Sequence, residues 1–210
     1  PTPLVPRRLR LPILERVKAQ GRIVTPLDEG SVAQAIEQLA RADIESVAIG
    51  FLHSYANAVH EHAVRDRIAR VLPSIAVTLS SDVCPEIREY DRFSTACANA
   101  YVQPLMASYL ERLAARLTSL GMTCPIFLVT SGGGLTTLET ARRVPIRLVE
   151  SGPAGGAILA GRIAVETGHR DVLSFDMGGT TAKICFLTEG MPEHSRRFEV
   201  ARVYRNLKGS

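Results

Sequence analysis

The residues with the clearest capacity for chemistry form the run 176–181, Asp-Met-Gly-Gly-Thr-Thr, directly after an apolar strand pattern. A carboxylate such as that of Asp176 at the end of a buried strand is costly unless it meets a cation or hydrogen-bond donors. Gly178 and Gly179 let the backbone turn tightly and approach a ligand closely. The backbone N–H groups of such a turn, with the hydroxyls of Thr180 and Thr181, can donate to an anion. The run therefore predicts a phosphate site at which Asp176 holds the water shell of a Mg²⁺ ion. The alternative is a plain type I′ hairpin with Asp176 as a capping residue.

Two further glycine-rich segments lie upstream of this run. Residues 131–134 read Ser-Gly-Gly-Gly after an apolar strand pattern, and Gly132 and Gly133 are expected to line a cleft for nucleotide or substrate. A flexible turn is the alternative. Residues 151–156 read Ser-Gly-Pro-Ala-Gly-Gly and begin a helix of small residues. A close-packed core helix is the alternative for this segment.

Histidines gather between positions 53 and 62, where His60 and His62 flank Glu61. Imidazoles and a carboxylate at this density can bind a metal such as zinc. His60 and His62 are only two positions apart, however, and point to different faces of a helix, which favours a packing role. His53 follows the carboxyl end of an apolar strand, where α/β folds place ligands. His53 is therefore the candidate metal ligand of this group.

Charged residues of both signs gather before the long helical pattern that begins near position 91. They are Glu86, Arg88, Glu89, Asp91 and Arg92. An ion-pair network on the surface, together with a helix cap, explains this pattern. A contact with substrate or with another subunit is the alternative.

The elements that must position these residues alternate between strand and helix patterns. In chain order we expect a short hairpin around Gly21, a helix over 31–40 with Ser31 as its N-cap, a strand over 46–52, a helix over about 57–72, a strand over 75–80, a helix over 91–120 with a kink at Pro104, a strand over 126–129, a helix from 151 to about 166, and paired strands over 172–175 and 182–187. The alternation in the first half predicts a mostly parallel sheet. A shift in composition near Gly121 predicts a boundary between an α/β region, 1–120, and a second region, 121–210, that carries the phosphate hairpin.

Composition excludes several classes of protein. The 210 residues are 46% hydrophobic and 22% charged, which is typical of a globular chain and not of a disordered, collagen-like or disulfide-rich one. The net charge of +4 comes largely from the two ends, and predicts a solvated surface without nucleic-acid binding. The four cysteines form no CxxC pair, and no apolar run approaches the roughly 20 residues that cross a bilayer. We therefore expect a cytoplasmic protein that makes no membrane contact, and a chain that is a piece of a longer one.

Five blocks of sequence, in this order, resemble the hydantoinase A / 5-oxoprolinase family of the actin-like ATPase superfamily. The blocks are FLHSYAN at 51–57, PEIREY at 85–90, NAYV at 99–102, SGPA at 151–154 and FDMGGT at 175–180. The resemblance implies an α/β fold of the actin-like ATPase (ribonuclease H-like) type, with mixed, mostly parallel sheets flanked by helices. It also implies ATP and Mg²⁺ as cofactors, Asp176 as the catalytic residue, and Ser151 and Gly152 at the nucleotide.

The activity that the resemblance implies is the ATP-driven opening of a cyclic amide of the hydantoin or 5-oxoproline type. A second, B-type subunit and an oligomer are implied as well. By order, the run at 176–181 corresponds to the second phosphate loop of the family, so the chain is expected to be a central fragment that is inactive by itself and binds ATP weakly at best. The alternatives are a subunit of an ATP-dependent ketone carboxylase and a non-catalytic actin-like nucleotide-binding module.

One position departs from the family pattern. Many members carry an acidic residue shortly after the threonines, whereas this chain has Lys183 there. Lys183 is expected to point outward from an exposed strand face; the alternative is that it points at a phosphate.

Overall fold

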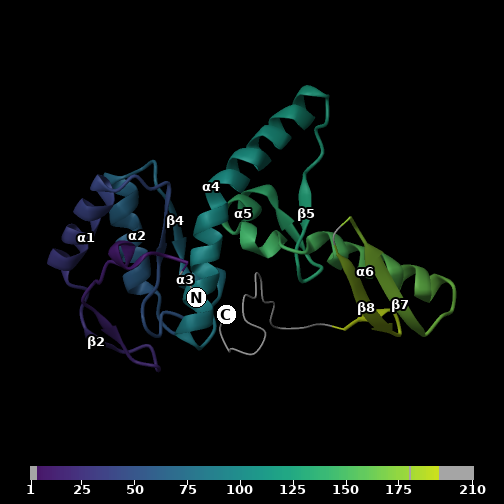
Figure 1. Ribbon diagram of the computed structural model, residues 1–210, viewed down its shortest axis with the longest axis horizontal. Coiled ribbons are helices and arrows are strands. Elements are labelled where there is room, and N and C mark those ends of the chain that lie inside the picture. Colours follow the sequence, from purple (N-terminus) through teal and green to yellow (C-terminus); the bar gives the residue numbers. More distant parts are fainter. Residues whose placement is uncertain (1–3, 180, 194–210) are drawn as a thin grey trace. The chain divides into compact units, whose positions relative to one another are not determined.

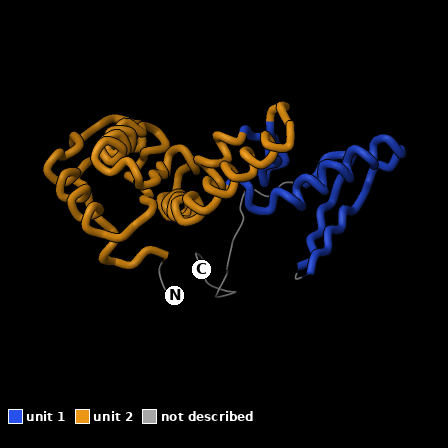
Figure 2. The backbone as a smooth tube through the Cα atoms, turned by 90° about the horizontal axis from the view of Figure 1, so that it is seen from above, with its two compact units in different colours: residues 1–2, 126–137, 147–210 blue, residues 3–125, 138–146 orange. Residues whose placement is uncertain are grey.

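A computed structural model describes residues 4–179 and 181–193 (Figure 1). Contacts between Cα atoms divide the chain into two compact units, coloured in Figure 2. Of the described residues, unit 2 contains 4–125 and 138–146, and unit 1 contains 126–137, 147–179 and 181–193. The short segment 138–146 thus packs with unit 2, although the segments on either side of it belong to unit 1.

Unit 2 is built on two parallel strands, β3 (Ser46–Ile49) and β4 (Ala76–Leu79), which pair in the register Ser46 to Ala76. The helix α2 (Val59–Val71) connects them, so the unit contains the expected β-α-β crossover. The helix α1 (Glu29–Arg41) buries one stripe of its surface on the same core. The buried core side chains are Val32, Ile36, Leu39, Ile49, Val64, Ile68 and Leu79.

Asp28, and not Ser31, is the N-cap of α1. The Asp28 carboxylate accepts from the backbone N–H of Ser31 at 2.7 Å, because the helix begins two residues before the position that the apolar spacing indicated. The Ser31 hydroxyl instead accepts from the backbone N–H of Leu14 at 3.1 Å and donates to the backbone carbonyl of Asp28 at 2.9 Å. The side chain expected to cap the helix therefore fastens the preceding segment to it.

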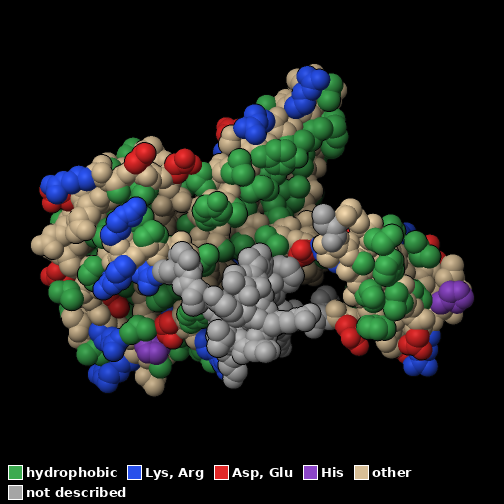
Figure 3. Space-filling model, viewed as in Figure 1, with side chains coloured by type: hydrophobic (Ala, Val, Ile, Leu, Met, Phe, Trp, Pro, Cys, Tyr) green, Lys and Arg blue, Asp and Glu red, His purple; other side chains and the backbone are tan. Residues whose placement is uncertain are grey.

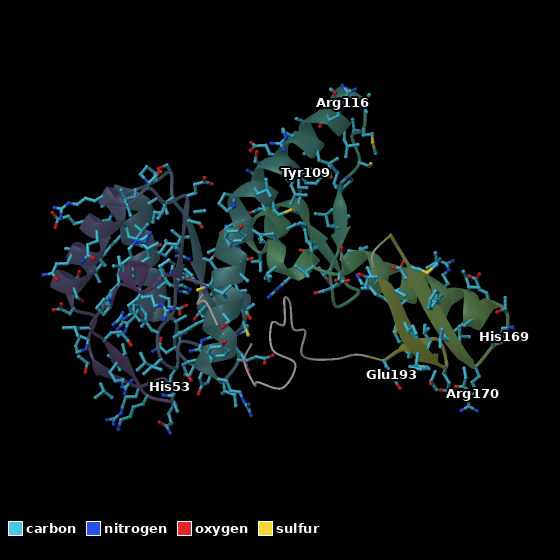
Figure 4. The ribbon with its side chains drawn as sticks, in the orientation of Figure 1. His53, Tyr109, Arg116, His169, Arg170 and Glu193 are labelled. Atoms are coloured by element: carbon cyan, nitrogen blue, oxygen red, sulfur yellow. The ribbon has the colours of Figure 1, made fainter. Side chains whose placement is uncertain are left out.

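The remaining elements of unit 2 surround this core. They are the 3₁₀ turn η1 (Arg7–Leu9), the hairpin of β1 (Arg16–Val17) and β2 (Ile23–Thr25), the short α3 (Ser80–Val83), the long α4 (Glu89–Ser119) and α5 (Leu138–Arg143). The helix α4 packs against β3 and β4 and runs on past them to the part that carries Tyr109 and Arg116 (Figure 4). Pro104 lies inside this helix, and Gly121 follows its end with a φ of +82°. The 3₁₀ turn η2 (Pro145–Leu148) leads out of the unit.

Unit 1 consists of one helix, α6 (Ser151–Glu166), one hairpin of β5 (Phe127–Val129) and β6 (Leu135–Thr137), and one antiparallel sheet. The sheet contains β7 (Asp171–Met177), β8 (Ala182–Thr188) and β9 (Met191–Pro192) in that order. The helix α6 packs along one face of the sheet. The packing is close at Gly161, where an added Cβ would collide with the carbonyl oxygen of Gly190.

The α/β class expected from the sequence is confirmed, with small sheets flanked by helices. Parallel pairing is confined to β3 and β4 among the described strands, and the other pairs are antiparallel. The reason is connection length, since a parallel pair needs a long crossover whereas the turns at Gly21, 130–134 and 178–181 hold only a few residues.

The sheet face of unit 1 that points away from α6 is apolar and exposed, as the green area over β7 and β8 in Figure 3 shows. Its large exposed side chains are Leu173, Phe175, Met177, Ile184 and Phe186. Within the part of the chain that the structure describes, no helix combines the length and the apolar character that crossing a membrane requires.

Candidate functional site

The turn at 178–181 closes the hairpin between β7 and β8. The N–H of Gly178 donates to the carbonyl oxygen of Thr181 at 3.0 Å, and Met177 pairs with Ala182 at the last position of the ladder. Thr180, expected to bind phosphate, lies outside the described residues. Neither Gly178 nor Gly179 has a positive φ, so the turn is not of type I′, which needs positive φ at two successive positions.

The two glycines of this turn have no packing reason among the described atoms. A Cβ added to Gly178 or Gly179 would meet nothing within 4 Å. Because neither φ nor packing requires glycine here, the remaining effect of the missing side chains is that a ligand can approach the backbone of the turn closely. Gly132 and Gly152 are open in the same way. This arrangement fits an anion such as a nucleotide phosphate.

Asp176 lies one position before the end of β7 and is exposed. Its cross-strand partner is Lys183, and residues directly opposite each other in an antiparallel pair share a face. The exposure leaves room at the Asp176 carboxylate for a hydrated cation, which is how Mg²⁺ usually meets a protein carboxylate.

Lys183 points toward α6, so the expectation of an outward side chain is wrong. Its ammonium group forms an ion pair with the carboxylate of Glu150, the residue directly before α6. The burial pattern of β8 explains the direction, since Lys183, Cys185 and Leu187 alternate on the half-buried or buried face of the strand. This ion pair places the first turn of α6, with Ser151 and Gly152, beside the hairpin that carries Asp176.

The glycine loop at 131–134 also packs on α6. Gly133 has a φ of +82°, and a Cβ there would lie 2.6 Å from Cδ1 of Ile158 on the helix. The N–H of Ser131 donates to the carbonyl oxygen of Arg147 at 2.7 Å, which fixes the loop to the segment leading into α6. Of the three glycine-rich segments of unit 1, one therefore packs on α6, one forms its first turns, and the hairpin that carries the third is linked to its start through Lys183. Gly133 has a structural explanation, whereas Gly132 does not.

His53 lies in unit 2 and not with the glycine-rich segments. Its φ is +59°, an uncommon value for a residue with a side chain, and its Nδ1 is buried without a hydrogen-bond partner in the described structure. The nearest carboxylate oxygen is Oε1 of Glu89 at 3.8 Å. Among the described residues there is no group of three or more His, Cys, Asp or Glu side chains that could hold a metal ion, so His53 as a metal ligand stays a prediction with one neighbouring carboxylate.

The other two histidines differ in exposure. His60 is buried and its Nδ1 lies 2.8 Å from Oε2 of Glu15, whereas His62 is exposed. His60 thus has the packing role that the two-residue spacing favoured.

Glu61 is a buried residue whose role the sequence did not reveal. Its side chain is 0% exposed, and its carboxylate accepts from the Ser80 hydroxyl at 2.6 Å, from both the N–H (3.0 Å) and the hydroxyl (2.6 Å) of Ser81, and from the N–H of Phe51 at 3.2 Å. The signal that could have indicated this burial is its spacing. Glu61, Val64 and Ile68 lie three and four positions apart, on the buried face of α2.

Arg92 completes the network from α4 and is also 0% exposed, so the expectation that the charged cluster lies wholly on the surface is wrong. Its Nε donates to the Ser80 hydroxyl at 3.2 Å, and its two terminal nitrogens donate to the carbonyl oxygens of Glu86 (2.7 Å) and Phe51 (3.0 Å). Burial of an arginine is tolerated because every direction of the guanidinium finds an acceptor or an aromatic ring. Ser80 links the two charges, donating to Glu61 and accepting from Arg92. The network ties the carboxyl ends of β3 and β4 to the starts of α2 and α4.

Glu89 connects this network to the loop that holds His53. The pKa of the Glu89 carboxyl is lowered, first by its own backbone N–H at the start of α4, and further by the backbone N–H of His53 and by Arg92, while partial burial opposes the shift. The ionised carboxylate therefore holds the loop after β3 against α4.

Comparison with known proteins defines the class of the chain. Residues 92–208 match the family model described as hydantoinase/oxoprolinase, and residues 1–72 match that of the hydantoinase/oxoprolinase N-terminal region. The first match covers more than half of the chain. The chain therefore belongs to the hydantoinase/oxoprolinase family, as the five sequence blocks indicated.

Three relatives show the range of the family. The caprolactamase subunit alpha of Pseudomonas jessenii is 35% identical over 95% of this chain and 29% of its own length. The crystal structure of the ATP-dependent caprolactamase from Pseudomonas jessenii matches with a TM-score of 0.79 at 36% identity, over 87% of this chain and 26% of the other. The nucleotide-free structure of acetone carboxylase, an enzyme of ATP-dependent acetone carboxylation, matches with a TM-score of 0.78 at 29% identity, over 90% of this chain and 27% of the other. The 5-oxoprolinase of Saccharomyces cerevisiae is 33% identical over 82% of this chain and 13% of its own length. The chain thus spans less than a third of the length of each of these relatives.

Proposed function

We propose that this chain is the central part of an ATP-dependent hydrolase subunit that opens a cyclic amide ring of the hydantoin or 5-oxoproline type. The observation that carries the proposal is that the hairpin with Asp176 and Lys183 is linked to the start of α6, while the open glycines of its turn begin two positions beyond that pair. The relatives named caprolactamase and 5-oxoprolinase support a cyclic amide as the substrate class.

The residues of unit 1 fit a magnesium nucleotide. The N–H of Gly179 and the hydroxyls of Thr180 and Thr181 would donate to phosphate oxygens, the missing side chain of Gly178 would let the ligand come close to the turn, and Asp176 would hold the hydration shell of Mg²⁺ as the catalytic carboxylate. The start of α6 at Ser151 and Gly152 would add the positive end of a helix dipole, and Gly132 would let the loop after β5 approach the ligand. ATP, when bound, supplies the phosphoryl group that makes a stable ring carbonyl reactive.

We further propose that the working enzyme contains more than this chain. The relatives named as subunits alpha, beta and gamma support a multi-subunit assembly, in which a second, B-type subunit is the expected partner. Because the run at 176–181 corresponds to the second phosphate loop of the family and the first is expected outside these residues, the chain alone is expected to bind ATP weakly and to be inactive.

The test is substrate-stimulated phosphate release from Mg-ATP by the full-length protein with its partner subunit. Asp176→Ala should abolish phosphate release while the circular dichroism spectrum stays unchanged, because the exposed carboxylate contributes little to the fold. Asp171→Ala, at the other exposed end of β7, is the matched control and should keep full turnover. Normal turnover in Asp176→Ala would remove the assignment of the site.

Acetone carboxylase supports a second candidate, a subunit of an ATP-dependent ketone carboxylase. The same assay separates the candidates when it is run with hydantoins, with 5-oxoproline, and with ketones in the presence and absence of bicarbonate. Stimulation by a ring amide supports the hydrolase, and stimulation by a ketone only with bicarbonate supports the carboxylase. Tight nucleotide binding without stimulation by any of them would indicate the non-catalytic module.

A further inference from the structure

The ion pair between Lys183 and Glu150 lies where the proposed phosphate site needs positive charge. Lys183 is opposite Asp176 in the ladder, two residues after Thr181, and its side chain reaches the start of α6. The Lys183 and Glu150 side chains are 38% and 33% exposed, so neither is committed to a dry interior. A half-exposed ion pair can exchange partners at low cost, whereas a buried one cannot.

Glu150 holds an unusual position for an acidic residue that precedes a helix. It is the N-cap of α6 with a φ of +62°, yet its side chain makes no capping hydrogen bond, and the first turn of α6 contains no acidic residue. The carboxylate that would normally cap the helix is directed to Lys183 instead. The first turn of α6 and the ammonium group of Lys183 therefore present positive charge side by side, and Glu150 is the anion that now balances it.

We propose that Lys183 is a phosphate-positioning residue that Glu150 holds in place before the nucleotide binds, and that a nucleotide phosphate then replaces Glu150 as the partner of the ammonium group. The inference rests on the proposed function, since it needs a nucleotide at the turn. A phosphate attracts the ammonium group more strongly than one carboxylate does, because it carries more charge and offers more acceptor oxygens. The exchange also loosens the link between β8 and the start of α6, so binding at the turn reaches the helix.

The exchange predicts that two substitutions in one ion pair change nucleotide affinity in opposite directions. Lys183→Met keeps the length of the side chain and removes its charge, and should weaken Mg-ATP binding about tenfold. Glu150→Gln removes the competing anion and should tighten binding about threefold. In the double variant the gain from Glu150→Gln should disappear, because the carboxylate then has no ammonium group to compete for.

A second ion pair in the same hairpin provides the matched control. Arg170, next to the start of β7, pairs with Glu189 at 2.6 Å, and both side chains are exposed. Figure 4 labels Arg170 beside His169 and Glu193. Since Asp171 pairs with Thr188, the pair lies at the end of the ladder opposite the 178–181 turn. Arg170→Met removes one positive charge and one ion pair from the same sheet, and should leave nucleotide affinity unchanged.

The experiment is calorimetric titration of the full-length protein and its variants with Mg-ATP, together with hydrogen exchange without nucleotide. Hydrogen exchange at the amides of 151–157 should be faster in Lys183→Met and in Glu150→Gln than in Arg170→Met, because both variants break the link to β8. Equal exchange in all three would show that the pair does not hold the helix, and would overturn the inference.

The titrations distinguish the failure of this inference from the failure of the proposed function. If the unaltered protein does not bind Mg-ATP, the proposed function fails and the inference falls with it. If the unaltered protein binds and Lys183→Met binds equally well, the inference alone fails. If Glu150→Gln weakens binding as Lys183→Met does, Glu150 serves the bound nucleotide directly, and the exchange of partners is contradicted.

Discussion

The two units of the chain differ in the burial of their key polar residues. In unit 2, Glu61, Arg92 and Asn99 are fully buried, and each makes several hydrogen bonds within the unit. In unit 1, Asp176 is exposed, and the glycines at 178 and 179 face open space. The polar groups of the first arrangement are buried and hydrogen-bonded, whereas the second leaves the Asp176 carboxylate and the backbone at its two glycines accessible.

This difference separates the residues whose type the fold explains from the residues whose type a ligand would explain. A buried charge is tolerated only when partners surround it, so the network around Glu61 and Arg92 is explained by the folding of unit 2 alone. The open glycines of unit 1 have no such explanation, because neither φ nor packing requires them. Residues that the fold does not explain are the ones to assign to a ligand. His53 lies at the edge of the buried network, but its Nδ1 has no hydrogen-bond partner in the described structure. It therefore combines the burial seen in unit 2 with the unsatisfied polar group expected of a ligand site.

The largest effect is expected from breaking the closed network at its centre. Glu61→Ala removes the acceptor for Ser80, Ser81 and the N–H of Phe51 in a fully buried network, while Arg92 keeps its ion pair with Glu89 at 3.5 Å. The free energy of unfolding should fall by about 3–5 kcal/mol. Urea denaturation followed by circular dichroism measures the change. Glu37→Ala, which removes an exposed ion pair with Arg41, is the control and should cost less than about 1 kcal/mol. Equal losses in the two variants would contradict a buried network.

A second substitution tests how segment 138–146 is held in unit 2. The side chain of Asn99 donates to the Thr78 hydroxyl at 2.9 Å and to the carbonyl oxygen of Arg143 at 3.2 Å, and accepts from the N–H of Ile146 at 3.1 Å. Asn99→Ala removes these three hydrogen bonds and should cost about 1–3 kcal/mol.

Hydrogen exchange locates the effect of this substitution. Exchange in 138–146 should accelerate more than exchange in α1, because Asn99 holds that segment directly. Gln34→Ala removes an exposed amide from α1 and should change neither quantity. Unchanged exchange in 138–146 would show that contacts other than those of Asn99 hold the segment.

The third prediction concerns pH and sharpens the contrast at Glu89. Because the folded state lowers the pKa of this carboxyl below its ordinary value of 4.5, the ionised form contributes stability at neutral pH. That contribution is lost as the pH falls below 4.5 and through the lower pKa of the folded state. Glu89→Gln should therefore be less stable than the unaltered protein at pH 7, with a difference that shrinks in acid. Stability curves that stay parallel from pH 7 to acid would contradict this role.

The smallest effect is expected for the reactivity of the cysteine thiols, which depends on how accessible each thiol is in unit 2. Burial raises the pKa of Cys97, and burial together with Glu86 raises that of Cys84, whereas Cys124 is exposed. A raised pKa lowers the fraction of reactive thiolate. Iodoacetamide at pH 8 should therefore modify Cys124 before Cys84 and Cys97, as peptide mass spectrometry would show. Equal rates for Cys124 and Cys97 would indicate that α4 opens at its start.

Much of the fold could be predicted because the signals are local. The apolar spacing on α1 and α2, the apolar runs of β3 and β4, and the Gly21 hairpin all appear at the expected places, within a few residues. The start of α1 was misplaced because a side-chain cap depends on which acceptor reaches the first N–H groups, and Asp28 lies outside the apolar pattern. The domain boundary near Gly121 stays a prediction. The units that the contacts define change at 125, but unit 2 also contains the later segment 138–146.

The sequence by itself determined the family, the α/β class and the identity of the glycine-rich segments, because motifs and periodicity are properties of neighbours along the chain. Only the tertiary structure decided which charges are buried. It turned Lys183 toward Glu150, set Glu61 and Arg92 on either side of Ser80, and placed His53 beside Glu89 in unit 2. The physical reason is that solvation and charge pairing depend on residues that are distant in sequence, such as Glu150 and Lys183, whose partnership no local spacing contains.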